Sequence, residues 1–313
     1  MRIIVTGGAG FIGSHVAEGL IERGHEVLVI DDLSAGKESN VCAGARFEKL
    51  DIRDRNHVDR IVDAFVPNAI SHHAAQASVS VSVREPALDA EINVMGSIHL
   101  LQAAQRHGAR VVFASTGGAL YGEVPEGEKA RESWPAKPLS PYACSKAAFE
   151  YYLRAKSDEV GLPYTILRYA NVYGPRQDPH GEAGVVAIFL NRLLKGEPIQ
   201  VNARKALGDD GCVRDYVYVT DVVAMNVHAL EGHLDRKTAN VGTGKPTSTR
   251  RLAETLVALC GASSEVRDGA HRPGDLERSV LDPSAISHFV PRLIDLEEGL
   301  ARTTSWFREQ HEK

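Results

Sequence analysis

The sequence predicts an α/β fold with a doubly wound parallel sheet, followed by a smaller mixed α/β lobe in the carboxyl-terminal part. A short β-branched run at the start leads into a glycine-rich turn and then into a helical pattern. Strand-like and helical segments alternate as far as residue 167, whereas segments punctuated by proline and glycine follow residue 171. Regular alternation of strands and helices builds a parallel sheet that is covered by helices on both faces.

The first strand is expected at 2–6, and the turn after it reads Gly7-Gly8-Ala9-Gly10-Phe11-Ile12-Gly13. A helical pattern then runs to residue 23, and a second strand is expected at 26–30. Glycines at the first, third and sixth positions of Gly8–Gly13 let backbone N–H groups and a helix N-terminus approach a pyrophosphate. The segment therefore predicts a dinucleotide-binding Rossmann unit.

Two carboxylates, Asp31 and Asp32, follow the second strand. A carboxylate at this distance from the glycines can accept hydrogen bonds from the adenosine ribose, and it repels a 2′-phosphate. A solvated turn is the alternative for such a pair. Because strand, glycine turn, helix and strand all precede it in register, we favour contact with the cofactor, and we predict NAD rather than NADP.

Later elements continue the alternation. Strands are expected at 46–50, 69–72, 111–114 and 164–167, and helices at 54–65, 87–107 and 142–160. Ligands of such sheets bind beyond the carboxyl ends of the strands. Asp51, His73-Ala74-Ala75 and Ser115-Thr116 all fall at those ends. In the last part of the chain, helices are expected at 185–195, 249–260 and 296–309.

Three side chains, Thr116, Tyr142 and Lys146, are the candidates for catalysis. Tyr142 and Lys146 are four residues apart, so on a helix they share a face, and the ammonium can stabilise a neighbouring phenolate. A free tyrosine has a pKa of about 10, so a base that works near neutrality needs its pKa lowered by roughly 3 units. An ammonium together with a cationic cofactor can supply that shift.

The same Tyr-x-x-x-Lys spacing occurs a second time, at Tyr152 and Lys156. On a continuous helix the second pair is rotated by roughly 80° from the first, so both pairs cannot face one ligand. Ser140-Pro141 reads as a helix start, which places Tyr142 in an exposed first turn and Tyr152 inside the helix. We therefore assign the chemistry to Tyr142 and helix packing to Tyr152.

Composition excludes several classes of function. The chain of 313 residues is 43% apolar and 25% charged, as is usual for a globular protein, and its formal net charge of -5 comes without a basic run. We therefore expect no nucleic-acid polymer as partner.

The chain starts without an apolar leader and has no long apolar window, so we expect a cytoplasmic protein with no membrane association. Four cysteines and thirteen histidines lack the usual ligand spacings, so no metal site is predicted.

These motifs together resemble the extended short-chain dehydrogenase/reductase family. The marks of the family are the glycine motif Thr6–Gly13, the Asp-Leu-Ser of 32–34, the alanines 74–75 and Tyr-x-x-x-Lys. Within the family the chain looks most like the UDP-glucose (UDP-galactose) 4-epimerases. That likeness lies in four blocks, which are 115–122, 167–176, 213–221 and 272–275.

The resemblance implies a Rossmann domain that binds NAD over 1–170 and a domain that binds the nucleotide sugar over 171–313, with some later strands returning to the first sheet. It implies a homodimer formed through helices around 93–105 and after Tyr142. The implied cofactor contacts are Gly7, Gly10, Phe11, Ile12, Gly13, Asp31, Asp32, Ser34, Gly36, Asp51, Ile52, His73, Ala74, Ala75, Ser115, Tyr142, Lys146 and Tyr169. The implied contacts of a UDP-sugar are Thr116, Tyr142, Asn171, Val185, Gln200, Asn202, Arg214, Arg272, Asp275 and Ser279.

By the same resemblance, Tyr142 removes the proton from the sugar 4-hydroxyl while C4 gives a hydride to NAD, and Thr116 hydrogen-bonds the oxygen. Dehydratases of the family carry an acidic residue after this Thr, whereas Gly117-Gly118 stand here, so epimerisation is favoured. Ser279 stands where epimerases that reject N-acetylated sugars carry an aromatic residue, so we expect UDP-GlcNAc and UDP-GalNAc to be accepted as well.

Two alternatives remain open. A 4-epimerase of UDP-glucuronic acid or of another nucleotide sugar shares the same chemistry. A non-catalytic NAD-binding sensor or scaffold on the same fold is expected to lose the tyrosine or the lysine, and both are present here. Two departures from the family pattern, Ala77 and the long segment 202–211, leave the details of the nucleotide loop open.

Overall fold

The computed structural model describes residues 1–180, 184–235, 237–272 and 274–312. The chain forms two compact units, each assembled from three stretches. The first unit contains Met1–Thr116, Pro138–Arg168 and Val222–Ala239. The second contains Gly117–Lys137, Tyr169–Asp221 and Asn240–Lys313. The units are thus interleaved along the sequence. The sequence analysis expected a boundary at residue 170 with some later strands returning to the first sheet, and β10 (Lys237–Val241) is such a strand.

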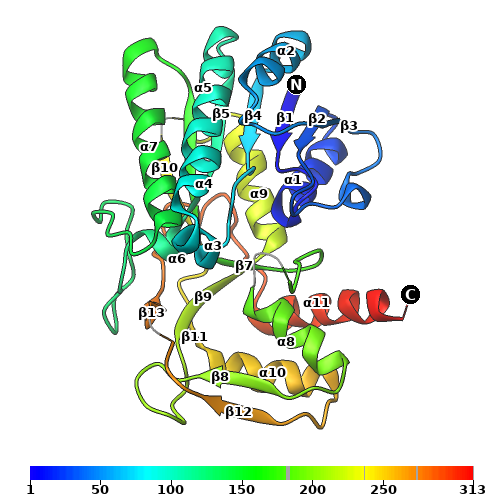
Figure 1. Ribbon diagram of the computed structural model, residues 1–313, viewed down its shortest axis with the longest axis vertical. Coiled ribbons are helices and arrows are strands. Elements are labelled where there is room, and N and C mark those ends of the chain that lie inside the picture. Colours follow the sequence, from blue (N-terminus) through cyan, green and yellow to red (C-terminus); the bar gives the residue numbers. More distant parts are fainter. Residues whose placement is uncertain (181–183, 236, 273, 313) are drawn as a thin grey trace. The chain divides into compact units, whose positions relative to one another are not determined.

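A seven-stranded sheet organises the first unit (Figure 1). Its strand order is β10-β6-β5-β4-β1-β2-β3, and β3, β2, β1, β4 and β5 pair in parallel. The predicted doubly wound sheet is therefore confirmed, with its change of direction between β1 and β4. The strands are β1 (Arg2–Thr6), β2 (Glu26–Asp31), β3 (Arg46–Lys49), β4 (Ala69–His72), β5 (Arg110–Thr116), β6 (Tyr164–Tyr169) and β10 (Lys237–Val241).

Helices pack on both faces of this sheet. One apolar core joins residues of β1, β2, β4 and β5 to residues of three helices, among them Val62, Leu101 and Phe149. On the other face α1 meets α9, where Gly19 lies against the Val223 side chain. The helices are α1 (Phe11–Glu22), α2 (Arg55–Phe65), α5 (Ser97–Arg106), α7 (Pro141–Val160) and α9 (Val219–Leu230), and a short 3₁₀ turn, η1, spans Glu38–Asn40.

The helix expected at 87–107 is divided into three pieces. They are α4 (Pro86–Ala90), a π-helical turn η2 (Glu91–Gly96) and α5, and α3 (Val79–Arg84) precedes them. Asn93, inside the π turn, exchanges two hydrogen bonds of 2.8 Å with the backbone of Gln76. The Ser97 hydroxyl donates to the Asn93 carbonyl at 2.7 Å. Side chains that bond to backbone in this way disturb the regular ladder, which periodicity alone does not reveal.

The second unit contains smaller sheets. Strand β9 pairs in parallel with β7 and β13 and antiparallel with β11, and β8 pairs in parallel with β12. The predicted smaller mixed lobe is therefore confirmed. Its strands are β7 (Asn171–Tyr173), β8 (Ile199–Asn202), β9 (Val213–Tyr218), β11 (Pro246–Ser248), β12 (Val266–Gly269) and β13 (Arg278–Ser279). Its helices are α6 (Gly117–Leu120), α8 (Val185–Leu194), α10 (Thr249–Cys260) and α11 (Leu296–His311).

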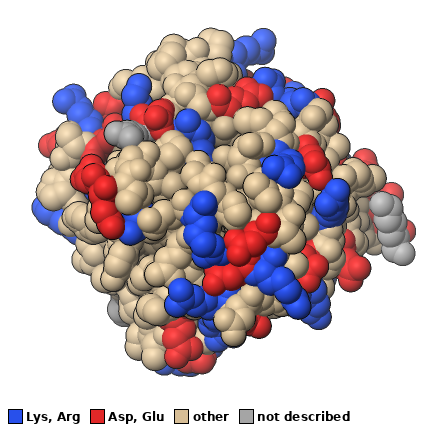
Figure 2. Space-filling model, turned by 90° about the horizontal axis from the view of Figure 1, so that it is seen from above, with Lys and Arg blue, Asp and Glu red and all other residues tan. Residues whose placement is uncertain are grey.

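The surface carries charges of both signs. On the face drawn in Figure 2, Lys and Arg side chains alternate with Asp and Glu side chains among neutral residues. Within the described residues, the helices are too short or too polar to span a bilayer.

Candidate active site

The glycine loop lies where the sheet changes direction. Gly7 has φ +67°, and a Cβ there would lie 2.6 Å from the backbone nitrogen of Ala74. The Ala74 N–H donates to the Thr6 hydroxyl at 3.2 Å, so the loop after β1 rests on the segment after β4. Dinucleotides bind in the crevice at this point of a doubly wound sheet.

The remaining glycines keep the loop tight. A Cβ at Gly13 would lie 2.2 Å from the Gly7 carbonyl oxygen, and the Gly10 N–H donates to that same oxygen at 3.1 Å. Gly10 caps α1, so Phe11, Ile12 and Gly13 form its first turn. The backbone N–H groups of a first turn have no acceptor within the helix, and they suit an anionic pyrophosphate. The loop therefore fits NAD.

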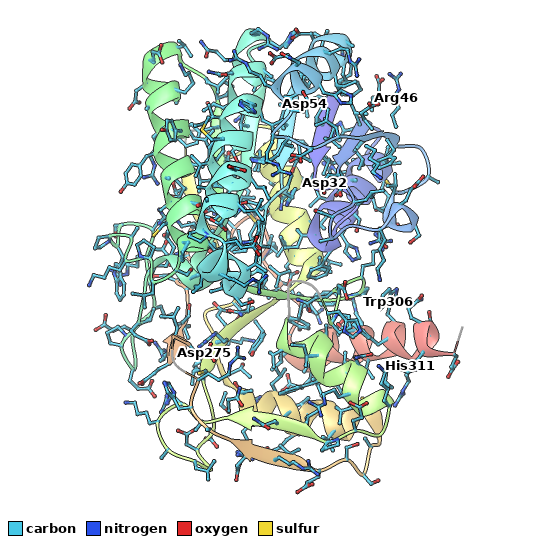
Figure 3. All side chains as sticks on the ribbon, viewed as in Figure 1. Asp32, Arg46, Asp54, Asp275, Trp306 and His311 are labelled. Atoms are coloured by element: carbon cyan, nitrogen blue, oxygen red, sulfur yellow. The ribbon has the colours of Figure 1, made fainter. Side chains whose placement is uncertain are left out.

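Asp31 and Asp32 occupy different environments. Asp31 is the last residue of β2, which ends one residue later than expected. It is buried, and its carboxylate accepts the N–H groups of Ala9 at 3.0 Å and Leu33 at 2.8 Å. Burial raises the pKa of Asp31, and these two N–H groups oppose that rise. Asp32 is exposed just past β2 and accepts the N–H and hydroxyl of Ser34 at 2.9 and 2.6 Å (Figure 3).

The connections after β2, β3 and β4 hold other predicted cofactor contacts. A Cβ at Gly36 would lie 2.8 Å from an Asp31 carboxylate oxygen, so this turn also needs glycine.

Asp51 follows β3 and pairs with the Arg53 guanidinium, which lowers the pKa of Asp51. Ile52 is buried. Burial lowers the pKa of His73 to about 3, so its imidazole is neutral, and its Nε2 lies 2.9 Å from the Ser71 hydroxyl.

Tyr142 and Lys146 lie on the first two turns of α7. The helix begins where the Ser140 hydroxyl accepts the Ala143 N–H at 3.2 Å, as the Ser-Pro sequence predicts. Lys146 is 4% exposed, and its Nζ donates to the Ala114 carbonyl of β5 at 3.0 Å. That Nζ lies 5.9 Å from the centre of the Tyr142 ring. Because Thr116 ends β5 two residues after Ala114, the three candidates belong to one neighbourhood of the first unit.

The two adjacent hydroxyls at the end of β5 differ in their surroundings. Ser115 is buried, and its hydroxyl donates to the Glu150 carboxylate at 2.7 Å. Glu150 also accepts two hydrogen bonds from Arg168, at 2.9 and 2.6 Å, and both of these charged groups are buried. The Ser115 hydroxyl thus points into the interior. Thr116 is half-buried.

In the second Tyr-x-x-x-Lys pair the tyrosine is exposed and the lysine is partly buried. Tyr152 is 49% exposed, and Lys156 pairs with Glu159 at 2.5 Å. Tyr152 is therefore not a core residue of the single chain, and its place at the expected dimer interface stays a prediction. Since α7 continues through both pairs, the rotation between them carries Tyr152 away from the side on which Lys146 meets β5.

A buried polar network that the sequence analysis missed supports the start of α7. The Ser145 hydroxyl donates to one oxygen of Asp89 at 2.6 Å. The amide groups of Gln76 and Asn93 donate to the other oxygen at 2.9 and 3.0 Å. Polar residues on the inward side of helical segments were the only signal in the sequence. The network connects α7 to α4 and η2, the elements that continue from β4.

In the second unit, three predicted substrate residues lie on neighbouring strands. Ser279 of β13 pairs with Arg214 of β9, and Asn171 of β7 pairs with Tyr216 of the same strand. Ser279 is buried, whereas Arg214 and Asn171 are partly exposed. The Asn171 carboxamide oxygen would lie 3.2 Å from a Cβ at Gly118, so its side chain lies beside the Gly117-Gly118 pair.

Other predicted contacts occupy separate places in this unit. Arg272 and Asp275 form a turn and an ion pair of 3.8 Å, and Pro273 between them lies outside the described residues (Figure 3). Gln200 and Asn202, on β8, bond to each other at 2.8 Å. Val185 begins α8, and Tyr169 is buried at the end of β6.

The chain is similar to known enzymes over its full length. The family model "NAD dependent epimerase/dehydratase family" matches residues 3–242. A UDP-glucose 4-epimerase of Mycolicibacterium smegmatis is 42% identical over 318 residues, which cover 99% of each chain. The crystal structure of the Thermus thermophilus UDP-glucose 4-epimerase in complex with NAD matches with TM-score 0.94 and 52% identity, over 98% of this chain and 99% of that chain. The Thermotoga maritima enzyme with UDP-glucose matches with TM-score 0.94 and 45% identity, over 99% and 100%. This chain therefore belongs to the NAD-dependent epimerase/dehydratase family.

Proposed function

We propose that the protein is an NAD-dependent UDP-glucose 4-epimerase, which interconverts UDP-glucose and UDP-galactose. The observation that carries the proposal is the placement of Tyr142 and Lys146 on α7 beside the end of β5, where Thr116 stands. The next two residues are Gly117 and Gly118, so no carboxylate follows Thr116 to assist an elimination. The names of the similar enzymes from M. smegmatis, T. thermophilus and T. maritima support the same reaction.

The residues of the chain then have the following roles. Tyr142 takes the proton from the sugar 4-hydroxyl, and it returns that proton to the same oxygen after the 4-keto sugar has turned its other face for the return of the hydride. Lys146, anchored on Ala114, favours the phenolate form of Tyr142 through its charge. Thr116 hydrogen-bonds the reacting oxygen. NAD, when it is bound, accepts the C4 hydride and gives it back, so turnover consumes no second substrate.

Residues of the second unit are proposed to bind the UDP-sugar. Arg214 and Arg272 suit the diphosphate, because a guanidinium fork matches phosphate oxygens. Asp275 is assigned to the uridine ribose and Asn171 to the sugar or the diphosphate. Val185, Gln200 and Asn202 complete the proposed contacts. The short side chain at Ser279 favours acceptance of N-acetylated sugars as a second activity.

The test is to incubate the purified protein, without added cofactor, with UDP-galactose and to follow UDP-glucose by NMR. We expect conversion, with NAD retained through purification. UDP-GlcNAc and UDP-glucuronate are assayed in parallel. If only UDP-GlcNAc or only UDP-glucuronate is converted, the protein is an epimerase of that sugar instead. If no sugar is converted even with added NAD, the proposal is overturned in favour of a non-catalytic NAD-binding protein.

Two further expectations belong to this proposal. The protein is expected to work in the cytoplasm. It is expected to form a homodimer through the helices around 93–105 and α7, whose exposed apolar residues are Met95, Tyr151, Tyr152 and Val160.

A further inference from the structure

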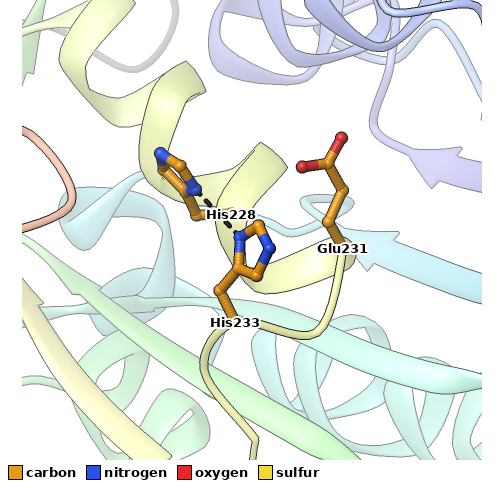
Figure 4. A group of neighbouring side chains, drawn as sticks. All are labelled: His228, Glu231 and His233. Carbon is orange, nitrogen blue, oxygen red and sulfur yellow. Dashed lines mark hydrogen bonds between the residues drawn. The ribbon is translucent and has the colours of Figure 1, made fainter.

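Two histidines and a glutamate meet at the end of α9, in the first unit (Figure 4). His228 lies in the last turn of the helix, and Glu231 and His233 follow it. One ligand atom from each of the three side chains lies within 4.8 Å of the others. The Nδ1 atoms of the two imidazoles face each other at 3.1 Å.

The backbone fixes this arrangement. The His233 N–H donates to the His228 carbonyl at 3.0 Å, and the Gly232 N–H donates to the Ala229 carbonyl at 3.1 Å. Gly232 has φ +90°, which a residue with a Cβ rarely adopts. These two bonds and the left-handed glycine are the Schellman helix ending, in which the residues at the positions of His228 and His233 usually form an apolar contact. Here two imidazoles occupy those positions.

The spacing between the imidazoles suits a metal ion. Zinc binds histidine nitrogen at about 2.0–2.1 Å in tetrahedral sites, which places two nitrogen ligands roughly 3.3 Å apart. The observed 3.1 Å is close to that value. We propose that His228, Glu231 and His233 bind one zinc ion, with water as the fourth ligand. Two nitrogens and one carboxylate oxygen form a common zinc donor set.

Neighbouring residues hold Glu231 in place. The Arg23 guanidinium donates to its two oxygens at 2.8 and 2.9 Å, and His25 Nε2 lies 3.4 Å from one of them. Each carboxylate oxygen can accept more than one partner, so an oxygen remains available to a metal. Metal ligands are commonly oriented by such hydrogen-bonded neighbours.

The cluster lies away from the candidate catalytic residues. Arg23 and His25 immediately precede β2, and the amino group of Met1 lies 3.2 Å from His25 Nδ1. The cluster therefore lies near the amino ends of β1 and β2. The glycine loop and Thr116 lie at the carboxyl ends of their strands. A zinc ion at this place would tie the end of α9 to the α1–β2 connection and take no part in catalysis.

The test is calorimetric titration of the untagged, chelator-treated protein with Zn²⁺. We expect one site, and weakening of at least about tenfold in His228→Gln and His233→Gln, because each change removes one of three protein ligands. His233 is exposed, so its replacement does not threaten folding. The matched control is His107→Gln, since His107 also contacts a carboxylate of the first unit, Asp63, at 2.7 Å. This control should bind zinc as the wild type does.

A second readout separates binding at this site from binding elsewhere. A hundredfold excess of Zn²⁺ over Kd should raise the Tm of the wild type and of the His107 variant by on the order of 5 °C, and that of the His233 variant far less. The absence of stoichiometric binding would show that the imidazoles only hydrogen-bond each other. Equal zinc binding by the wild type and both ligand variants would place the ion elsewhere. Either result overturns the proposal.

Discussion

At the scale of single residues, the two Tyr-x-x-x-Lys pairs have the same spacing in the sequence, but their lysines lie in different surroundings in the fold. Tyr142 precedes a lysine that is buried against β5, whereas Tyr152 precedes a lysine that pairs with Glu159 at the surface. A buried ammonium acts on its neighbours through a low dielectric, and an exposed one is screened by water. The surroundings of Lys146 therefore support the proposed assignment of proton transfer to Tyr142.

The matched pair of variants Tyr142→Phe and Tyr152→Phe tests this assignment. Loss of the hydroxyl at 142 should lower kcat for UDP-galactose by about 10²–10⁴-fold, because it removes the group that moves the proton. Loss of the hydroxyl at 152 should leave kcat within about twofold, since that side chain is exposed, and the absorbance of retained NAD should be the same in both variants. A large loss of kcat in Tyr152→Phe, or none in Tyr142→Phe, contradicts the assignment.

Glu150 and Glu159 provide a second matched comparison on α7. Glu150→Gln should lower the free energy of unfolding by about 3–5 kcal/mol, because it leaves the buried Arg168 without its charged partner. Glu159→Gln should change it by about 0–1 kcal/mol, since the Lys156–Glu159 pair is at the surface. Urea unfolding of the two variants measures the difference. Similar losses in both would show that the buried ion pair contributes no more than the exposed one.

Sequence reasoning reached some of these residues and not others, for physical reasons. Tyr142 and Lys146 could be proposed from the sequence because the expected chemistry needs those side chains at a fixed spacing. Glu150 and Arg168 were missed because they are eighteen residues apart and meet only after α7 packs beside β6. The His228–His233 cluster was missed because a helix ending, and not a ligand-spacing motif, brings its imidazoles together.

At the scale of elements, glycines determine where backbone segments approach closely. Gly13→Ala places a methyl group 2.2 Å from the Gly7 carbonyl oxygen, where only movement of the loop can relieve the overlap. We expect this variant to lose the NAD that the wild type retains. The control is Gly19→Ala on the same helix, whose methyl group would meet the Val223 side chain at 2.8 Å. A side chain can move aside, so the control should keep its NAD, as absorbance of the denatured protein can show.

Asp221, in the first turn of α9, predicts a dependence of stability on pH. Burial raises the pKa of Asp221 to about 6, although the Ile294 N–H, which donates to it at 3.0 Å, acts in the opposite direction. In the unfolded chain the pKa is about 3.9. The folded form therefore binds the proton more tightly, so this contribution is fully present below about pH 4 and is lost as the pH rises through 6.

The variant Asp221→Asn removes that dependence. Between pH 4.5 and pH 7.5 the free energy of unfolding of the variant should rise by about 2 kcal/mol relative to that of the wild type. Asp282→Asn is a control of opposite sign, because a hydrogen bond from Ser284 lowers the pKa of Asp282. Urea midpoints at the two pH values give the comparison. No relative gain for Asp221→Asn means that this carboxyl titrates at its ordinary pKa in the fold.

Elements were predicted well where apolar periodicity is regular and poorly where polar bonds interrupt it. The strand at 69–72 has the predicted bounds, and α7 begins one residue before its predicted start, since Ser140 caps it. The helix expected at 87–107 is interrupted at Asn93, which bonds to the backbone of Gln76. A pattern of apolar residues does not contain that long-range bond.

At the scale of the whole molecule, the fold class could be read from the alternation of strands and helices. The composition of the compact units could not, because Val222–Ala239 belongs with the first sheet although it lies between two stretches of the second unit in the sequence. Its membership depends on long-range contacts, such as that of Gly19 with Val223 and that of Arg23 with Glu231. Such contacts leave no periodic signal in the sequence.

Two copies of the chain are expected to assemble through α7 and η2. Exposed apolar side chains lie on α7 and on η2, which packs against it, and their burial in a second copy would stabilise a dimer. Light scattering should give a mass near twice the 33.9 kDa of the chain. Met95→Glu combined with Tyr152→Glu should give a monomer, because two charges would be buried on each side. Leu207→Glu, at a residue that is 71% exposed in the second unit, should remain dimeric. A monomeric wild type, or a dimeric double variant, excludes this interface.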